Sequence, residues 1–144
     1  MVIPKQWSRF RVPIDRSIIG MQSPPATFEV ERGAIRKLAR AIDDQTPEYQ
    51  RGDIAPPTFP TTFRMDDVPW FQSVDRSSFI HTNQEYVYER PLVAGDVITV
   101  VERVVDVFEK QGKLGLMTFI VSETDGRDPN GALVYRARST RLTH

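Results

Sequence analysis

The sequence contains no cysteine and only two histidines in 144 residues. The absence of cysteine excludes disulfides, cysteine-ligated zinc sites and thiol catalysis. So few histidines disfavour a histidine-rich metal site, and we expect no metal. Neither sign of charge is in excess, because 19 basic side chains balance 19 acidic ones and the pI is about 6.7. This balance disfavours a general binder of nucleic acid or of anionic membranes.

Long hydrophobic runs are also missing. The longest uncharged run, from Ser17 to Phe28, is 12 residues long and contains Pro24 and Pro25, which is too short to span a bilayer. The first ten residues include Lys5 but no apolar run of the kind found in secretory signals. We therefore expect a cytoplasmic protein with no membrane partner. Its length predicts a single domain over residues 1–144.

The segment 31–42 has the clearest helical pattern. Its apolar residues recur at positions i, i+3, i+4 and i+7, so they share one face of a helix. These residues are Ile35, Leu38, Ala39 and Ile42. Thr46-Pro47 is expected to stop this helix.

A second helix is predicted to begin at Pro56 and Pro57. Proline is tolerated in the first turn of a helix, where the backbone N–H has no intrahelical partner. The following residues would give this helix a strongly apolar body, with Phe59, Phe63 and Met65.

After Phe79 the apolar pattern changes to a period of two, which is typical of strands. Turn-forming residues such as Gly95-Asp96 and Gln111-Gly112 separate the strands, and residues 125–131 read as a loop. The predicted strands are 27–30, 80–90, 97–108, 114–123 and 132–142. Helices followed by an antiparallel meander predict an α+β fold whose sheet buries one face.

Three stretches carry residues in a distinctive order and spacing. They are residues 30–49, ending in Asp43-Asp44-Gln45-Thr46-Pro47-Glu48-Tyr49; residues 55–60, Ala55-Pro56-Pro57-Thr58-Phe59-Pro60; and residues 81–96, running from His81 to Gly95-Asp96. Over about residues 12–140 the sequence resembles the MaoC-like dehydratase family, in its FAS1-like dehydratase N-terminal domain branch.

The resemblance implies a hot-dog fold, in which a long curved antiparallel β-sheet wraps around a central α-helix. The helix opened by Pro56 and Pro57 would be the central one. The family hydrates trans-2-enoyl thioesters or dehydrates (R)-3-hydroxyacyl thioesters. The acyl group is carried on coenzyme A or acyl carrier protein, and the resemblance implies no cofactor and no metal.

The sequence departs from the catalytic motif of the family. Catalytic members carry Gly-Asp-x-Asn-Pro-x-His, in which the Asp and the His hold one water between them. Here Asp44 matches the Asp and Pro47 matches the Pro, but Tyr49 occupies the His position. An unperturbed tyrosine has a pKa of about 10, so it is a poor general base near neutral pH.

A second departure concerns the backbone N–H that polarises the thioester carbonyl in catalytic members. The matching glycine position is occupied by Pro57, which has no N–H to donate. The N–H of Thr58 would replace it only if the backbone shifted.

These two departures favour a subunit that binds the acyl group without performing the chemistry. The resemblance implies pairs of hot-dog units, as tandem domains or heterodimers, in which one unit carries the Asp–His pair and the other shapes the acyl path. We expect a second hot-dog subunit as partner, in a heterodimer or a homodimer. That path would be bordered by Asp44, Tyr49, Pro57, Thr58 and Phe59.

Two alternatives remain open. The chain is either an active homodimeric hydratase that uses Asp44 and His81, or an acyl-thioester binding protein without turnover. The same residues could equally have structural roles with no part in catalysis. Asp44 would bond local backbone N–H groups, Tyr49 would be a packed aromatic residue, and His81 would structure a turn or contact a partner.

Overall fold

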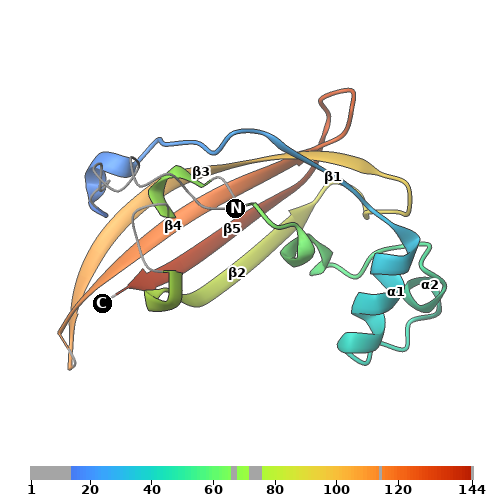
Figure 1. Cartoon of the computed structure of the whole chain (residues 1–144), viewed down its shortest axis with the longest axis horizontal. Helices are drawn as coiled ribbons and strands as arrows, with labels where there is room; N and C mark the ends of the chain where they lie inside the picture. Colours follow the sequence, from blue (N-terminus) through green and yellow to red (C-terminus); the bar gives the residue numbers. More distant parts are fainter. Residues whose placement is uncertain (1–13, 66–67, 72–75, 114, 144) are drawn as a thin grey trace, which may run out of the picture.

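The computed structural model describes residues 14–65, 68–71, 76–113 and 115–143. Their main feature is one antiparallel sheet of five strands in the order β1-β3-β4-β5-β2. Figure 1 shows that the long strands curve along their length. The strands are β1 (Ala26–Glu29), β2 (Ile80–Tyr88), β3 (Val97–Gly112), β4 (Gly115–Arg127) and β5 (Leu133–Thr143). The predicted α+β class is confirmed. The predicted meander holds only for β3, β4 and β5, because β2 pairs with β5 at the edge of the sheet and not with β3, so residues 89–96 connect strands that are not neighbours.

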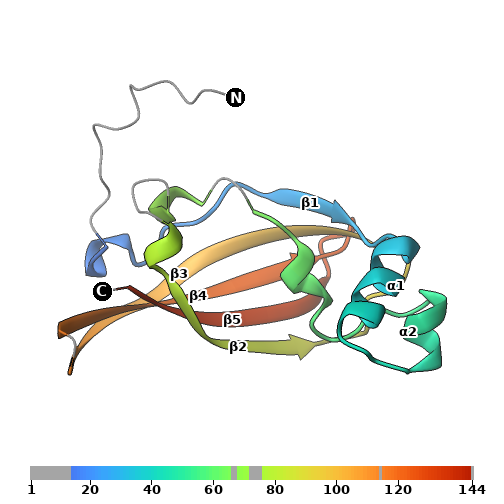
Figure 2. The same cartoon turned by 60° about the horizontal axis from the view of Figure 1, so that its bottom comes forward.

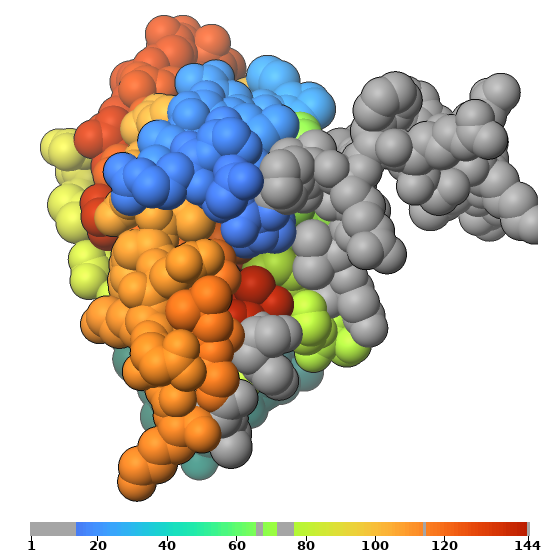
Figure 3. Space-filling view, turned by 90° about the vertical axis from the view of Figure 1, so that its left-hand side faces the viewer, coloured from blue at the N-terminus to red at the C-terminus, as the bar shows by residue number. Residues whose placement is uncertain are grey.

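The strands β3 and β4 are longer than predicted. Their hairpin extends beyond β5 and projects from one end of the sheet, in orange in Figures 1 and 3. Residues 125–127, predicted as loop, belong to β4. Within this strand, Gly126 leaves room for the ring of Tyr135, its cross-strand partner on β5.

Two α-helices lie together at the other end of the sheet (Figure 2). Helix α1 (Arg32–Ala41) confirms the predicted amphipathic helix, and its Ile35 and Ala39 are fully buried. Helix α2 (Pro47–Arg51) was not predicted. Pro47 starts this helix instead of only stopping the first one, since proline fits the first helical position. Gly52, with φ of 77°, ends it in the left-handed conformation.

Between Pro56 and Phe79, the described residues lie over one face of the sheet (Figure 2) and do not form the predicted central α-helix. Its described part contains three short 3-10 turns, η3 (Phe59–Thr62), η4 (Pro69–Phe71) and η5 (Arg76–Ser78). In η3 the backbone bonds run from Phe59, Thr61 and Phe63 to the residue three positions earlier. Pro56, Pro57 and Pro60 supply no N–H, so continuous α-helical bonding cannot build up here.

The core consists of two clusters on the same side of the sheet. The first lies toward α1 and contains Phe59, Leu92, Val100 and Tyr135. The second lies toward the projecting hairpin and contains Trp70, Phe71, Val104 and Ile120, with Ile18 from the turn η2 (Arg16–Ile18). Met65 packs against both clusters. No helix in the described residues is both long and apolar enough for a membrane crossing.

Candidate functional site

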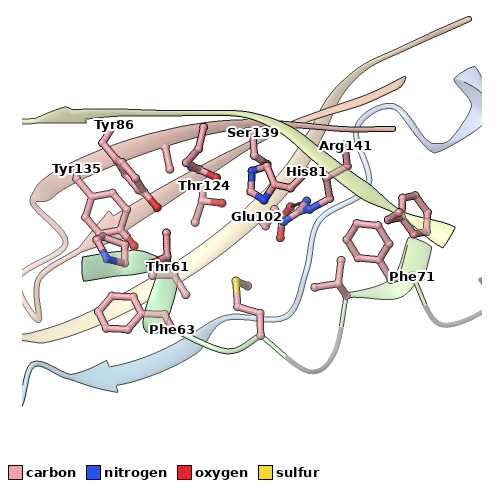
Figure 4. Close-up of a pocket in the computed structure, with 17 residues that line it drawn as sticks. Thr61, Phe63, Phe71, His81, Tyr86, Glu102, Thr124, Tyr135, Ser139 and Arg141 are labelled. Carbon is pink, nitrogen blue, oxygen red and sulfur yellow. Dashed lines mark hydrogen bonds and ion pairs between the residues drawn. The ribbon is translucent and has the colours of Figure 1, made fainter. Parts of the chain in front are cut away.

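A cavity of about 380 Å³ lies between the sheet and the overlying segment that begins at Pro60. This volume is in the range of small-molecule sites. Its roof is apolar and comes from the overlying segment, with Phe63, Met65, Val68, Phe71 and Phe79. Figure 4 shows side chains of the sheet pointing toward Phe63 and Phe71 across this space.

The floor of the cavity is polar, although an antiparallel sheet normally turns apolar side chains toward its covered face. Neighbouring strands contribute side chains at paired positions: Glu102 of β3 is the cross-strand partner of Thr124 of β4. Ser139 of β5 is paired with Ser122 of β4, which is 1% exposed and lies beneath the floor. In turn, Ser139 faces Gln84 of β2, and Arg141 faces His81. The floor therefore crosses four strands.

A buried ion pair organises this floor. Arg141 Nη1 donates to Glu102 Oε1 at 2.7 Å, and Glu102 is only 4% exposed. The Ser122 hydroxyl donates to the same oxygen at 2.6 Å and lies 2.9 Å from the Ser139 hydroxyl. The guanidinium of Arg141 also lies over the Phe71 ring, 5.0 Å from its centroid. A charge pair that is largely removed from solvent depends on these added hydrogen bonds and contacts.

Two tyrosines complete the cavity toward α1. Burial raises the pKa of Tyr86 to about 12, and burial raises the pKa of Tyr135 well above its ordinary value. Both phenols are therefore protonated at neutral pH. They can donate a hydrogen bond to a ligand but cannot act as bases.

Asp44 lies between α1 and α2 and bonds local backbone. Its Oδ1 accepts a hydrogen bond from the Thr46 N–H at 2.9 Å. Hydrogen bonding to Thr46, first to its side chain and then to its backbone N–H, lowers the pKa of the carboxyl. The Gln50 side-chain amide donates to the Asp44 carbonyl at 2.6 Å. The local role considered for Asp44 is thus present in the structure.

Tyr49 and Pro57 line a second, smaller cavity of about 340 Å³, together with Tyr88 and Leu92. The Tyr88 hydroxyl donates to the Pro57 carbonyl at 2.6 Å. The structure therefore brings Tyr49 and Pro57 together, but apart from the polar floor.

The other predicted site residues are placed differently. Thr58 is exposed and precedes η3, and Phe59 is 1% exposed in the core. His81 is exposed at the start of β2, borders the larger cavity and has its Nε2 2.9 Å from the Asn83 carbonyl. Asp44 lies with the helices at the opposite end of β2 (Figure 2). Within one chain, Asp44 and His81 are not brought together.

Comparison with known proteins identifies the family. A family model described as "FAS1-like, dehydratase domain region" matches residues 17–137. The chain belongs to this FAS1-like dehydratase family. Among its relatives is a UPF0336 protein from Saccharopolyspora erythraea. The two sequences are 31% identical in an alignment 146 positions long, which covers 90% of each chain.

Solved structures agree with the hot-dog architecture of this FAS1-like dehydratase domain. The HadBC (3R-hydroxyacyl-ACP dehydratase) complex of Mycobacterium tuberculosis is similar with a TM-score of 0.74 and 26% identity, covering 87% of this chain and 96% of that one. The ChsH1–ChsH2 complex of the same organism has a TM-score of 0.69 at 22% identity, covering 85% and 83%. A MaoC-like dehydratase has a TM-score of 0.72 at 20% identity, covering 88% and 42%. The last two likenesses show the fold alone.

Sequence reasoning missed the polar floor of this FAS1-like dehydratase domain. One signal was available, because Glu102 stands at an inward position between Val100 and Val104 in a period-two pattern. The partners of Glu102 come from other strands, and their meeting depends on the strand register. The ion pair with Arg141, 39 residues away, has no local signature.

Proposed function

We propose that this chain is the acyl-binding subunit of an (R)-specific enoyl-thioester hydratase or 3-hydroxyacyl-thioester dehydratase. A second hot-dog subunit supplies the catalytic Asp–His pair. The acyl group arrives on coenzyme A or acyl carrier protein, and no cofactor takes part. The observation that carries the proposal is the cavity above the sheet in a FAS1-like dehydratase domain whose own Asp44 and His81 stand apart.

The cavity has properties that suit an acyl chain. Its roof offers Phe63, Met65 and Phe79, which favour burial of methylene groups; each buried methylene contributes about 0.8 kcal/mol. The described part of the overlying segment contains short turns and no long helix, so the space that such a helix would fill stays available. In the reaction, the partner adds the water oxygen to C3 and a proton to C2 of the enoyl thioester, or reverses both steps. This chain holds the acyl group that carries those carbons.

Strand β2 is the edge on which we place the second subunit. It ends the sheet, and its Ile80 and Val87 are 51% and 66% exposed. A bare edge with exposed apolar side chains favours pairing with another strand. The similar HadBC and ChsH1–ChsH2 structures are themselves complexes.

The test is hydration of short and long trans-2-enoyl-CoA by the purified chain, alone and mixed with a hot-dog protein that carries Gly-Asp-x-Asn-Pro-x-His. We expect no turnover by the chain alone and turnover of the long substrate by the mixture. Val87→Asp should abolish complex formation in size-exclusion chromatography, while the outward-facing Arg103→Gln on the internal strand β3 should not.

Either of two results would contradict the proposal. Turnover by the chain alone would favour the active homodimer, and Asp44→Asn with His81→Ala would then test that mechanism. Binding of acyl thioesters with no activity in any pairing would favour the binding protein without turnover.

A further inference from the structure

The polar floor of the cavity has hydrogen-bonding groups left over. Arg141 uses only Nη1 for Glu102 and Ser122, and within the described residues its Nε and Nη2 make no hydrogen bond. Likewise Glu102 accepts both of its side-chain hydrogen bonds at Oε1, and Oε2 receives none from the described residues. An arginine donor and a carboxylate acceptor therefore stand side by side at the cavity wall.

These groups are held in place before any ligand arrives. The ion pair and the Phe71 ring fix the guanidinium, and the hydroxyl of Ser122 fixes the carboxylate. The Arg141 side chain keeps 24% of its surface exposed, whereas that of Glu102 keeps 5%. A donor and an acceptor that are already oriented bind a matching group at little cost in side-chain entropy.

The net charge of the Arg141–Glu102 pair determines which kind of ligand group the floor can bind. The carboxylate of Glu102 cancels the charge of Arg141, so the pair gives no net attraction for a carboxylate or phosphate. Its adjacent donor and acceptor match a hydroxyl, which both accepts and donates a hydrogen bond. A keto oxygen would satisfy only Arg141, and a plain methylene chain would satisfy neither group.

Other polar side chains of the floor also favour a ligand that can form hydrogen bonds. The side chains of Gln84 and Thr124 border the same cavity, and neither makes a hydrogen bond to another side chain or to the backbone among the described residues. Buried polar groups covered by an alkyl chain lose water without gaining a partner, and this loss weakens binding.

We propose that the cavity selects acyl groups that carry a hydroxyl in the chain beyond the reacting carbons, bound between Arg141 and Glu102. This inference rests on the proposed function, because it assumes that the acyl chain enters this cavity. It makes the chain a selector of hydroxylated over plain alkyl thioesters.

The test is isothermal titration calorimetry of the full chain with three kinds of dodecanoyl-CoA. One is unsubstituted, and the others carry a single hydroxyl or a single keto group, at successive carbons in the distal half of the chain. We expect one hydroxylated isomer to bind at least about tenfold more tightly than the unsubstituted thioester. The keto compound at the same carbon should bind more weakly than the hydroxylated one.

The variants separate recognition from folding. Arg141→Met alone leaves Glu102 as an unpaired buried charge, so the double variant Arg141→Met/Glu102→Gln is used as well, with circular dichroism to verify its fold. The double variant should lose the tenfold preference for the hydroxylated thioester. Arg138→Met, on the outer face of the same strand, is the matched control and should keep the preference.

The failures are distinguishable. No binding of any acyl thioester would overturn both the proposed function and this inference. Equal binding of plain and hydroxylated thioesters, an equal or greater affinity for the keto compound, or a preference that survives in the double variant would overturn the inference alone. The inference would also be overturned if coenzyme A without an acyl group competed as strongly as the hydroxylated acyl-CoA, because the floor would then bind the carrier arm.

Discussion

Tyr135 lies against Gly126 on the neighbouring strand so closely that a Cβ on the glycine would be 2.2 Å from Tyr135 Cε1. Tyr135 is 1% exposed and packs against Tyr86 and Tyr88, so its ring cannot move away without disturbing both. We predict that Gly126→Ala lowers the free energy of unfolding by about 1–3 kcal/mol through overpacking. Urea unfolding measures this change.

The control for that substitution is Gly33→Ala in α1. A Cβ at Gly33 meets no atom within 4 Å, and alanine has a helix propensity up to about 1 kcal/mol better than glycine. We expect Gly33→Ala to leave stability unchanged or raise it slightly. If Gly126→Ala and Gly33→Ala changed stability equally, the close contact between Gly126 and Tyr135 would not be the cause of the loss.

The ion pair between Glu102 and Arg141 predicts strongly unequal effects of single and double substitutions. Arg141→Met should lower the free energy of unfolding by about 3 kcal/mol, because it leaves a buried carboxylate without its partner. Adding Glu102→Gln removes that charge and should recover most of the loss. Urea unfolding of the two variants checks the prediction, and equal stability of the single and double variants would contradict it.

The outer face of the sheet predicts a pH dependence of stability. Hydrogen bonds of 2.7 and 3.1 Å from Arg136 lower the pKa of the Asp125 carboxyl. A carboxyl whose pKa is lower in the folded state stabilises the fold above its unfolded-state pKa of about 3.9. That contribution is lost as the pH falls through the lower folded-state pKa.

Asp125→Asn should therefore lower stability at pH 7 by about 1 kcal/mol or less, since the pair is partly exposed. The difference from the unsubstituted protein should begin to close below a pH of about 3.9, as the native carboxyl becomes protonated. Urea unfolding between pH 7 and pH 3 measures this difference. A difference that stays constant over the whole range would show that the Asp125 ion pair does not stabilise the fold.

The strands and α1 were predictable because their apolar residues follow the period of the element. In α1 the buried residues Ile35 and Ala39 are four positions apart, and along β3 the buried residues Ile98 and Val100 alternate with more exposed ones. Such patterns are local, so they can be read without knowing the fold. The segment opened by Pro56 and Pro57 could not be predicted in this way, because its apolar residues suit a helix and its missing N–H groups do not.

The candidate site was less predictable than the fold. The family motif directed attention to Asp44 and Tyr49, which the structure places with the helices. The residues that meet under the cavity, Glu102, Ser122 and Arg141, come from three different strands. Only the register of those strands brings them together. In hairpins the register follows from turn type and loop length, and the loop between β4 and β5 was predicted too long, because residues 125–127 belong to β4.

Ala137 offers a test of the acyl path that leaves the polar network untouched. It is 5% exposed, belongs to β5 and borders the cavity between Ser139 and Tyr135. A larger side chain at this position would extend into the cavity, so Ala137→Leu should shorten the acyl chain that fits. In the complex with a catalytic partner, we expect KM for a long enoyl-CoA to rise at least about tenfold, the effect of about 1.4 kcal/mol, and KM for crotonyl-CoA to change little. Arg138→Leu, which faces the other side of the sheet, is the matched control. Equal losses for the long and short substrates, with the fold intact by circular dichroism, would place the acyl chain outside this cavity.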